Sequence, residues 1–171
     1  MHLLYCWRCD LGDLDYRLEP DGGVTLLGEQ EWLERLRQLG RDPEEVRARL
    51  RDPDTDYPYS NYPRAFPLRA ATLRPLAAGE QESILGWERD NDNELPETLD
   101  HPRHQVGGLP YLSQGSSYVP TCGDCRQPMA FFASIADDCG DPRGFTSNEY
   151  VQVVFFVCPA CRRVHATNMV E

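Results

Sequence analysis

Two apolar segments near the carboxyl end of the chain predict a pair of antiparallel β-strands. Residues 129–135 and 150–157 are rich in β-branched and aromatic side chains, which favour strands. A polar connection, residues 137–149, separates them, and residues 164–169 are the candidate for a third strand. The pattern therefore predicts an antiparallel sheet as the core of the protein.

The first 50 residues predict a hairpin followed by two short helices. Residues 14–18 and 24–27 flank the turn sequence Pro20-Asp21-Gly22-Gly23, as expected for two paired strands. Apolar side chains then recur at helical spacing and stop at Gly40, and Pro43 lies in the first turn of a second helix. The helical stripe consists of Trp32, Leu33, Leu36 and Leu39, continued by Val46 and Leu50.

The middle of the chain has little regular periodicity. Five prolines alternate with aromatic residues between residues 52 and 75, which excludes a regular helix or a central strand there. Residues 83–87 predict a short strand, and residues 88–100 predict an acidic loop. We expect one compact unit with three parts: a knuckle, hairpin and helical pair (1–55), a Pro/Tyr-rich and acidic connection (56–100), and a β core (101–171).

The length and the apolar runs indicate a soluble cytoplasmic protein. The chain has 171 residues, enough for one domain of ordinary size. No apolar run approaches the roughly 20 residues that cross a bilayer, and the first residues lack the basic and apolar regions of a secretion signal. In a reducing compartment, clustered cysteines are metal ligands more often than disulfides.

The charge of the chain is strongly negative and unevenly distributed. The net charge is −11, and residues 1–100 carry 22 acidic residues and 12 arginines, against six and five in residues 101–171. A negative surface repels phosphate backbones and anionic lipid headgroups, so nucleic-acid and membrane binding are disfavoured. The charge favours a basic protein as partner. An oligomeric state does not follow from the sequence.

Four of the seven cysteines have the spacing of a tetrahedral zinc site. Cys122 and Cys125 precede the first strand of the carboxyl-terminal pair, and Cys158 and Cys161 follow the second. When two strands run antiparallel, the start of one lies beside the end of the other. Both Cys-x-x-Cys pairs then meet at one end of the hairpin, which is the arrangement of a zinc ribbon.

Two other uses of these cysteines fit the sequence less well. A redox dithiol of the thioredoxin type lies where a strand leads into a helix, and no helical stripe follows Cys161. A zinc deaminase needs a His-x-Glu element, which the chain lacks. Four thiolates also fill the coordination shell of zinc and leave no position for a reactive water. We therefore predict a structural zinc ion.

A third pair, Cys6 and Cys9, predicts a second metal site, and the sequence leaves several candidates for its remaining ligands. The hairpin that follows this pair offers none. The candidates to complete the site are His101 with His104, or Cys139 with His165. The first set is favoured because its histidines are spaced as a pair. A pair that binds no metal is the third interpretation.

Residues 104–114, His-Gln-Val-Gly-Gly-Leu-Pro-Tyr-Leu-Ser-Gln, resemble the entry motif of the YwqG-like domain family. Segments 120–125, 129–135 and 150–161 are similar to cysteine-bearing variants of that family, which in turn resemble the carboxyl-terminal part of eukaryotic programmed-cell-death-two-like proteins. The resemblance covers roughly residues 84–165. The Cys6/Cys9 segment and the helical pair are additions to the family pattern.

The resemblance implies a mostly β fold, a cytoplasmic location and no established catalytic activity. Related domains have been proposed as immunity proteins that neutralise toxins, or as escorts for a ribosomal protein. The usual Asp/Gly motif of the second half of the family corresponds here only to Asp141-Pro142-Arg143-Gly144.

These patterns together predict an α+β protein with an antiparallel β-sheet core. A zinc-ribbon-like hairpin and a small amino-terminal knuckle with a helical pair complete the expected fold. We expect a non-enzymatic, zinc-stabilised module that binds a basic protein. The alternative is a zinc-dependent hydrolase that uses an open second metal site at Cys6, Cys9 and a histidine.

Overall fold

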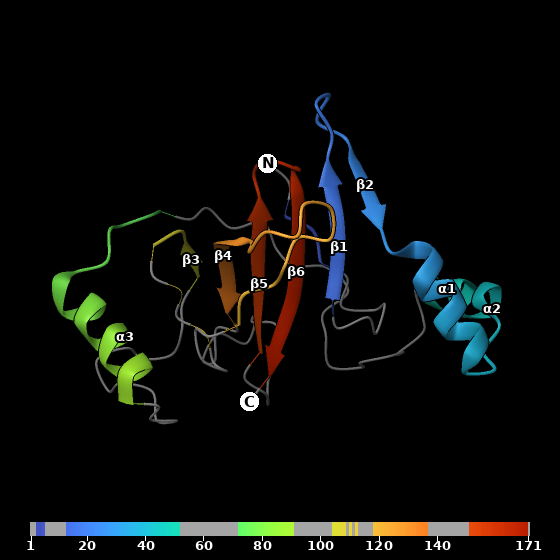
Figure 1. Cartoon of the computed structure of the whole chain (residues 1–171). Helices are drawn as coiled ribbons and strands as arrows, with labels where there is room; N and C mark the ends of the chain where they lie inside the picture. Colours follow the sequence, from blue (N-terminus) through green and yellow to red (C-terminus); the bar gives the residue numbers. More distant parts are fainter. Residues whose placement is uncertain are drawn as a thin grey trace.

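Six antiparallel strands form one sheet with the order β2-β1-β6-β5-β4-β3 (Figure 1). The computed structural model describes residues 3–5, 13–51, 72–90, 104–108, 110, 112, 118–136 and 151–170. The strands are β1 (Asp13–Leu18), β2 (Val24–Leu27), β3 (Gln105–Val106), β4 (Ala130–Ala136), β5 (Val151–Cys158) and β6 (Arg163–Val170). With three helices beside this sheet, the predicted α+β class is confirmed, whereas the ribbon-type zinc site remains a prediction.

The amino-terminal hairpin joins the sheet through β1, which pairs with β6. Asp13 lies opposite Thr167 and Tyr16 opposite Val164, so residues about 150 positions apart in the chain become neighbours. Strands from the first 55 residues and from residues 101–171 thus share one sheet. The hairpins predicted for residues 14–27 and 129–157 are both confirmed, as is the third strand after Cys161.

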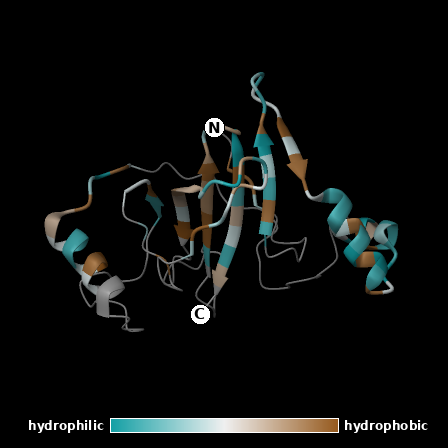
Figure 2. Cartoon of the chain, in the orientation of Figure 1, coloured by the Kyte–Doolittle hydropathy of each residue, from teal (hydrophilic) through white to brown (hydrophobic). Residues whose placement is uncertain are grey.

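The sheet has a buried cluster of apolar side chains on each of its two faces. Alternate residues of a strand point to opposite faces, which divides neighbours such as Phe155 and Phe156 between the clusters. The first cluster consists of Tyr16, Ala133, Val153, Phe155, Val164 and Ala166. The second consists of Leu112, Cys122, Met129, Val154, Phe156, Cys158 and Met169. Figure 2 shows the hydrophobic residues along β5, which, like β6, contributes to both clusters.

Two helices follow β2 as a helical hairpin, as predicted. These are α1 (Glu29–Gln38) and α2 (Pro43–Arg51). Gly40 lies in the turn between them with φ of 68°, and the Asp42 carboxylate accepts the Glu44 N–H at 3.0 Å, which caps α2. Leu33 and Leu36 are buried, but Leu39 of the predicted stripe is 63% exposed.

The strand predicted for residues 83–87 is wrong, because this segment lies inside helix α3 (Ala78–Asp90). The short apolar run around Ile84 belongs to a longer helix whose start is capped. The Glu80 carboxylate accepts the Ala77 N–H at 2.7 Å and pairs with Arg74, which is half of a capping box. Within the described part of the chain, no helix is long and apolar enough to span a membrane.

Replacing Phe155 with Ala should lower the free energy of unfolding by about 3–5 kcal/mol, the usual effect of emptying a buried aromatic site. Phe155 is 2% exposed in the middle of the sheet. Leu26→Ala is the matched control, because Leu26 lies in the same sheet but is 56% exposed and should change stability by less than about 0.5 kcal/mol. Urea unfolding checks both values, and similar losses in the two variants would contradict this assignment of the core.

Candidate metal centre

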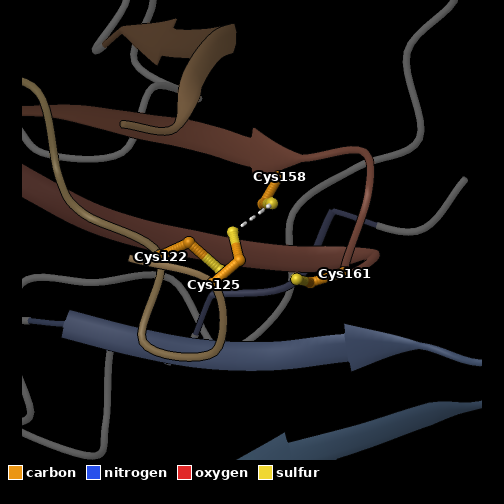
Figure 3. A group of neighbouring side chains, drawn as sticks. All are labelled: Cys122, Cys125, Cys158 and Cys161. Carbon is orange, nitrogen blue, oxygen red and sulfur yellow. Dashed lines mark hydrogen bonds between the residues drawn. The ribbon is translucent and has the colours of Figure 1, made fainter. Parts of the chain in front are cut away.

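Four cysteine sulfurs lie together at one end of the sheet. The Sγ atoms of Cys122, Cys125, Cys158 and Cys161 are all within 4.8 Å of one another (Figure 3). A zinc ion with Zn–S bonds of about 2.3 Å places its sulfurs about 3.8 Å apart, and Cys125 and Cys158 are 3.6 Å apart. The cluster could therefore hold a metal ion, and its size fits zinc.

The first cysteine pair lies in a tight turn just before β4. The N–H of Cys122 donates to the Gln127 carbonyl at 2.8 Å, and the N–H of Arg126 donates to the Cys122 carbonyl at 2.9 Å. A bridge between Thr121 and Pro128 closes the turn. These bonds fix the backbone so that the two cysteines face the end of β5.

The second pair lies in the turn between β5 and β6. Cys158 is the last residue of β5 and lies opposite Arg163. The residue after the second cysteine adopts a left-handed conformation in both turns, with φ of 61° at Arg126 and 53° at Arg162. No other non-glycine residue in the described segments has a positive φ. The two cysteine turns therefore have the same backbone conformation after the second cysteine. Residues other than Gly adopt this left-handed conformation only at some energetic cost.

Antiparallel pairing of β4 and β5 brings the two turns together. Ala130 at the start of β4 lies opposite Val157 at the end of β5. This register confirms the predicted meeting of the start of one strand with the end of the other. Zinc binding by the four thiols stays a prediction that this geometry supports.

The close approach of the four sulfurs is accompanied by pKa shifts in opposite directions at two of the thiols. Burial raises the pKa of the Cys122 thiol, but the backbone N–H groups of Cys125 and Asp124 donate to its sulfur and lower the pKa to about 7. The hydrogen bond with the Cys125 thiol raises the pKa of Cys161 to about 12. Ionisation of Cys122 thus makes ionisation of Cys161 less favourable. A divalent cation removes this conflict because it stabilises all the thiolates at once.

A carboxylate inside the first cysteine turn connects the thiol cluster to β1 and β6. Asp124 accepts from Arg17 of β1 at 2.9 Å and from Arg163 of β6 at 3.3 Å. Arg163 also pairs with Asp15 at 3.3 Å. Gly123 lies directly under the Arg163 guanidinium, where an added Cβ would be 2.5 Å from Nη1. We call Asp15, Arg17, Asp124 and Arg163 the arginine–aspartate brace.

His165 belongs to a hydrogen-bond network beside this brace. It is 8% exposed, with Nδ1 3.2 Å from the Asp15 carboxylate and Nε2 3.1 Å from the Tyr118 hydroxyl. Both ring nitrogens thus have partners within the protein, one in β1 and one in the segment before the first cysteine turn. This arrangement argues against the interpretation in which His165 and Cys139 complete a metal site with Cys6 and Cys9.

The favoured second metal site falls mostly outside the described residues. Cys6, Cys9 and His101 lie there, as does Cys139. His104 is described and exposed, immediately before β3. The second site therefore stays a prediction from the sequence.

Gly123→Ala should destabilise the protein by about 1 kcal/mol, because the new methyl group meets the end of the Arg163 side chain and displaces the guanidinium from its ion pairs. Gly86→Ala is the matched control. Gly86 lies in α3, and an added Cβ there would have no atom within 4 Å, so alanine at this position should be neutral or stabilising. Thermal unfolding of the zinc-loaded chains checks the difference, and an unchanged stability of the Gly123 variant would contradict the close approach of Arg163.

The effect of Asp15→Asn should depend on pH. Burial raises the pKa of Asp15, but hydrogen bonds from His165 and Arg163 outweigh burial and lower the pKa below its ordinary value of 3.8. A lowered pKa stabilises the fold at higher pH, and this contribution disappears as pH falls through the folded-state pKa. Wild type should be more stable than the variant by about 1 kcal/mol at pH 7.

Urea unfolding of both chains from pH 7 to pH 3 checks this dependence. The difference between wild type and variant should be constant near neutrality and shrink below about pH 4. Loss of any metal ion bound by the cysteines at low pH would affect both chains and cancel in the difference. A constant difference over the whole range would be inconsistent with an ionised Asp15 in the brace.

Comparison with known proteins leaves the cysteine cluster as the main guide to function. No family model, curated protein or solved structure matches the chain. The likeness of residues 84–165 to YwqG-like domains therefore stays a prediction.

Proposed function

We propose that this chain is a zinc-stabilised protein-binding module that does no chemistry at its metal. The observation that carries the proposal is the convergence of four cysteine sulfurs within 4.8 Å of one another. Four sulfur ligands suit zinc, which prefers a tetrahedral arrangement of soft donors. When bound, the ion supplies a cross-link between the two cysteine turns.

The complete set of four thiolates favours a structural role. Catalytic zinc sites usually have three protein ligands and a fourth position for water or substrate. Here Cys122 and Cys158 are buried and all four cysteines face one another, so the protein alone fills the coordination shell. Zinc held in this way stabilises the fold, because the site is not formed in the unfolded chain.

The proposed partner is a basic protein. Residues 1–100 carry 22 acidic residues against 12 arginines, a charge that attracts basic surfaces and speeds encounter. Leu26 of β2 and Leu39 after α1 are exposed, and apolar contacts of this kind add affinity to a charged interface. Neutralising a toxin and escorting a basic protein are the two roles that the family resemblance favours.

Metal binding should raise stability in a way that depends on the four cysteines. Free zinc at about 100 times its dissociation constant stabilises a folded chain by about 2.7 kcal/mol, and chelation should reverse this. Cys158→Ser should abolish most of the zinc-dependent shift in Tm. Cys139→Ser changes a cysteine that is not one of the four proposed ligands, and this variant should keep the zinc-dependent shift in Tm. Equal zinc dependence in both variants would rule out the proposed site.

Partner binding can be tested with the zinc-loaded chain as bait in a pull-down from its native cytosol. Retained proteins should have isoelectric points above neutrality and should be released by high salt, because salt screens charge pairs. Glu31→Lys with Glu34→Lys, two exposed positions of α1, should reduce retention several-fold. Arg35→Lys on the same helix keeps the charge and should have no effect. Failure to retain any basic protein at low salt would count against the proposal.

A further inference from the structure

The four clustered thiols differ in their access to solvent. Cys122 and Cys158 are 0% and 4% exposed, whereas Cys125 and Cys161 are partly exposed. Each turn thus contributes one buried and one accessible sulfur. A small oxidant in solution reaches Cys125 and Cys161 before it reaches the other two.

One close contact joins sulfurs from different turns. Cys125 Sγ lies 3.6 Å from Cys158 Sγ, and Figure 3 shows Cys161 to one side of this contact. A disulfide requires a sulfur–sulfur distance of about 2 Å, so the two sulfurs must approach each other by about 1.6 Å for the bond to form. An accessible thiol therefore faces a buried one across the two turns.

We propose that hydrogen peroxide converts the cluster into a Cys125–Cys158 disulfide and releases the metal. This inference rests on the proposed function, because it concerns regulation of the same zinc site. It adds a redox response to a site that otherwise only stabilises the fold.

The reaction has two steps. The Cys125 thiolate attacks one peroxide oxygen, forming an S–O bond while the O–O bond breaks and hydroxide leaves. The Cys158 thiolate then attacks the sulfur of this sulfenic acid, forming the S–S bond while the S–O bond breaks and a second hydroxide leaves. The two thiolates lose two electrons, which reduce peroxide to two hydroxide ions. Cys122 and Cys161 remain as thiols, too few to retain the zinc ion tightly.

The disulfide would join the same two turns that the metal joins. Residues 122–125 would stay attached to the end of β5, and the Asp124 carboxylate would keep its contacts with Arg17 and Arg163. Oxidation therefore exchanges a metal cross-link for a covalent one. The sheet should survive oxidative loss of zinc, whereas removal of zinc from the reduced chain should destabilise it.

Hydrogen peroxide treatment of the zinc-loaded full chain tests this inference. Zinc release, followed with a chromophoric chelator, should reach one equivalent from the cluster. Peptide mapping without reduction should find Cys125 joined to Cys158, and circular dichroism should show that the sheet is retained. Reductant with zinc should restore the starting state. A disulfide within either turn, irreversible sulfinic acid, or loss of the sheet on oxidation would overturn the inference.

Two variants that each remove one accessible ligand provide a matched comparison. Cys161→Ser should still form the Cys125–Cys158 disulfide with peroxide, whereas Cys125→Ser should not. Both lose one zinc ligand, so weaker metal binding alone does not separate them. Equal oxidation of the two variants at Cys158 would contradict the proposed pairing.

The redox inference and the proposed function can fail separately. A chain that binds no zinc disproves the structural metal site, and peptide mapping of that metal-free chain still decides whether Cys125 pairs with Cys158. A chain that binds zinc and holds it through peroxide treatment disproves the redox response alone.

Discussion

The structure depends on the crowding of four sulfur atoms at one end of a β-sheet. Thiols this close cannot all ionise unless a cation lies among them, because each thiolate raises the pKa of its neighbours. The lowered pKa of Cys122 and the raised pKa of Cys161 are consistent with this effect. Protons, a disulfide or a divalent metal can each resolve it, and a tetrahedral zinc ion would do so for all four thiolates together.

The cluster also organises the strands around it. One cysteine turn is continuous with β4 and the other connects β5 to β6. Asp124 extends the same centre to β1 through Arg17 and Arg163. The cluster and its neighbours thereby link residues from both ends of the chain, and a metal ion bound there would add stability to the fold. Strand β2 and helices α1 and α2 follow β1 in the chain, and β1 joins them to the rest of the sheet.

The sequence predicted the cysteine cluster because its signals are local. Each Cys-x-x-Cys pair lies beside an apolar strand, and antiparallel pairing of adjacent strands is enough to bring the pairs together. The brace was not predictable, because the pairing of β1 with β6 joins distant segments and no local pattern encodes it. No local sequence pattern singles out Gly123, Asp124 or Arg163. The prediction of a strand at residues 83–87 was wrong because it used only the short apolar run at Ile84 and Leu85 and not the helix start that precedes this run.

We propose that the four cysteines bind one zinc ion through sulfur alone. X-ray absorption at the zinc edge of the loaded chain measures this directly, because it reports the type, number and distance of the coordinating atoms. The Cys6→Ser, Cys9→Ser double variant restricts the measurement to the described cluster. We expect four sulfur neighbours at about 2.3 Å. Oxygen or nitrogen neighbours in this variant, or a chain that takes up no zinc, would contradict it.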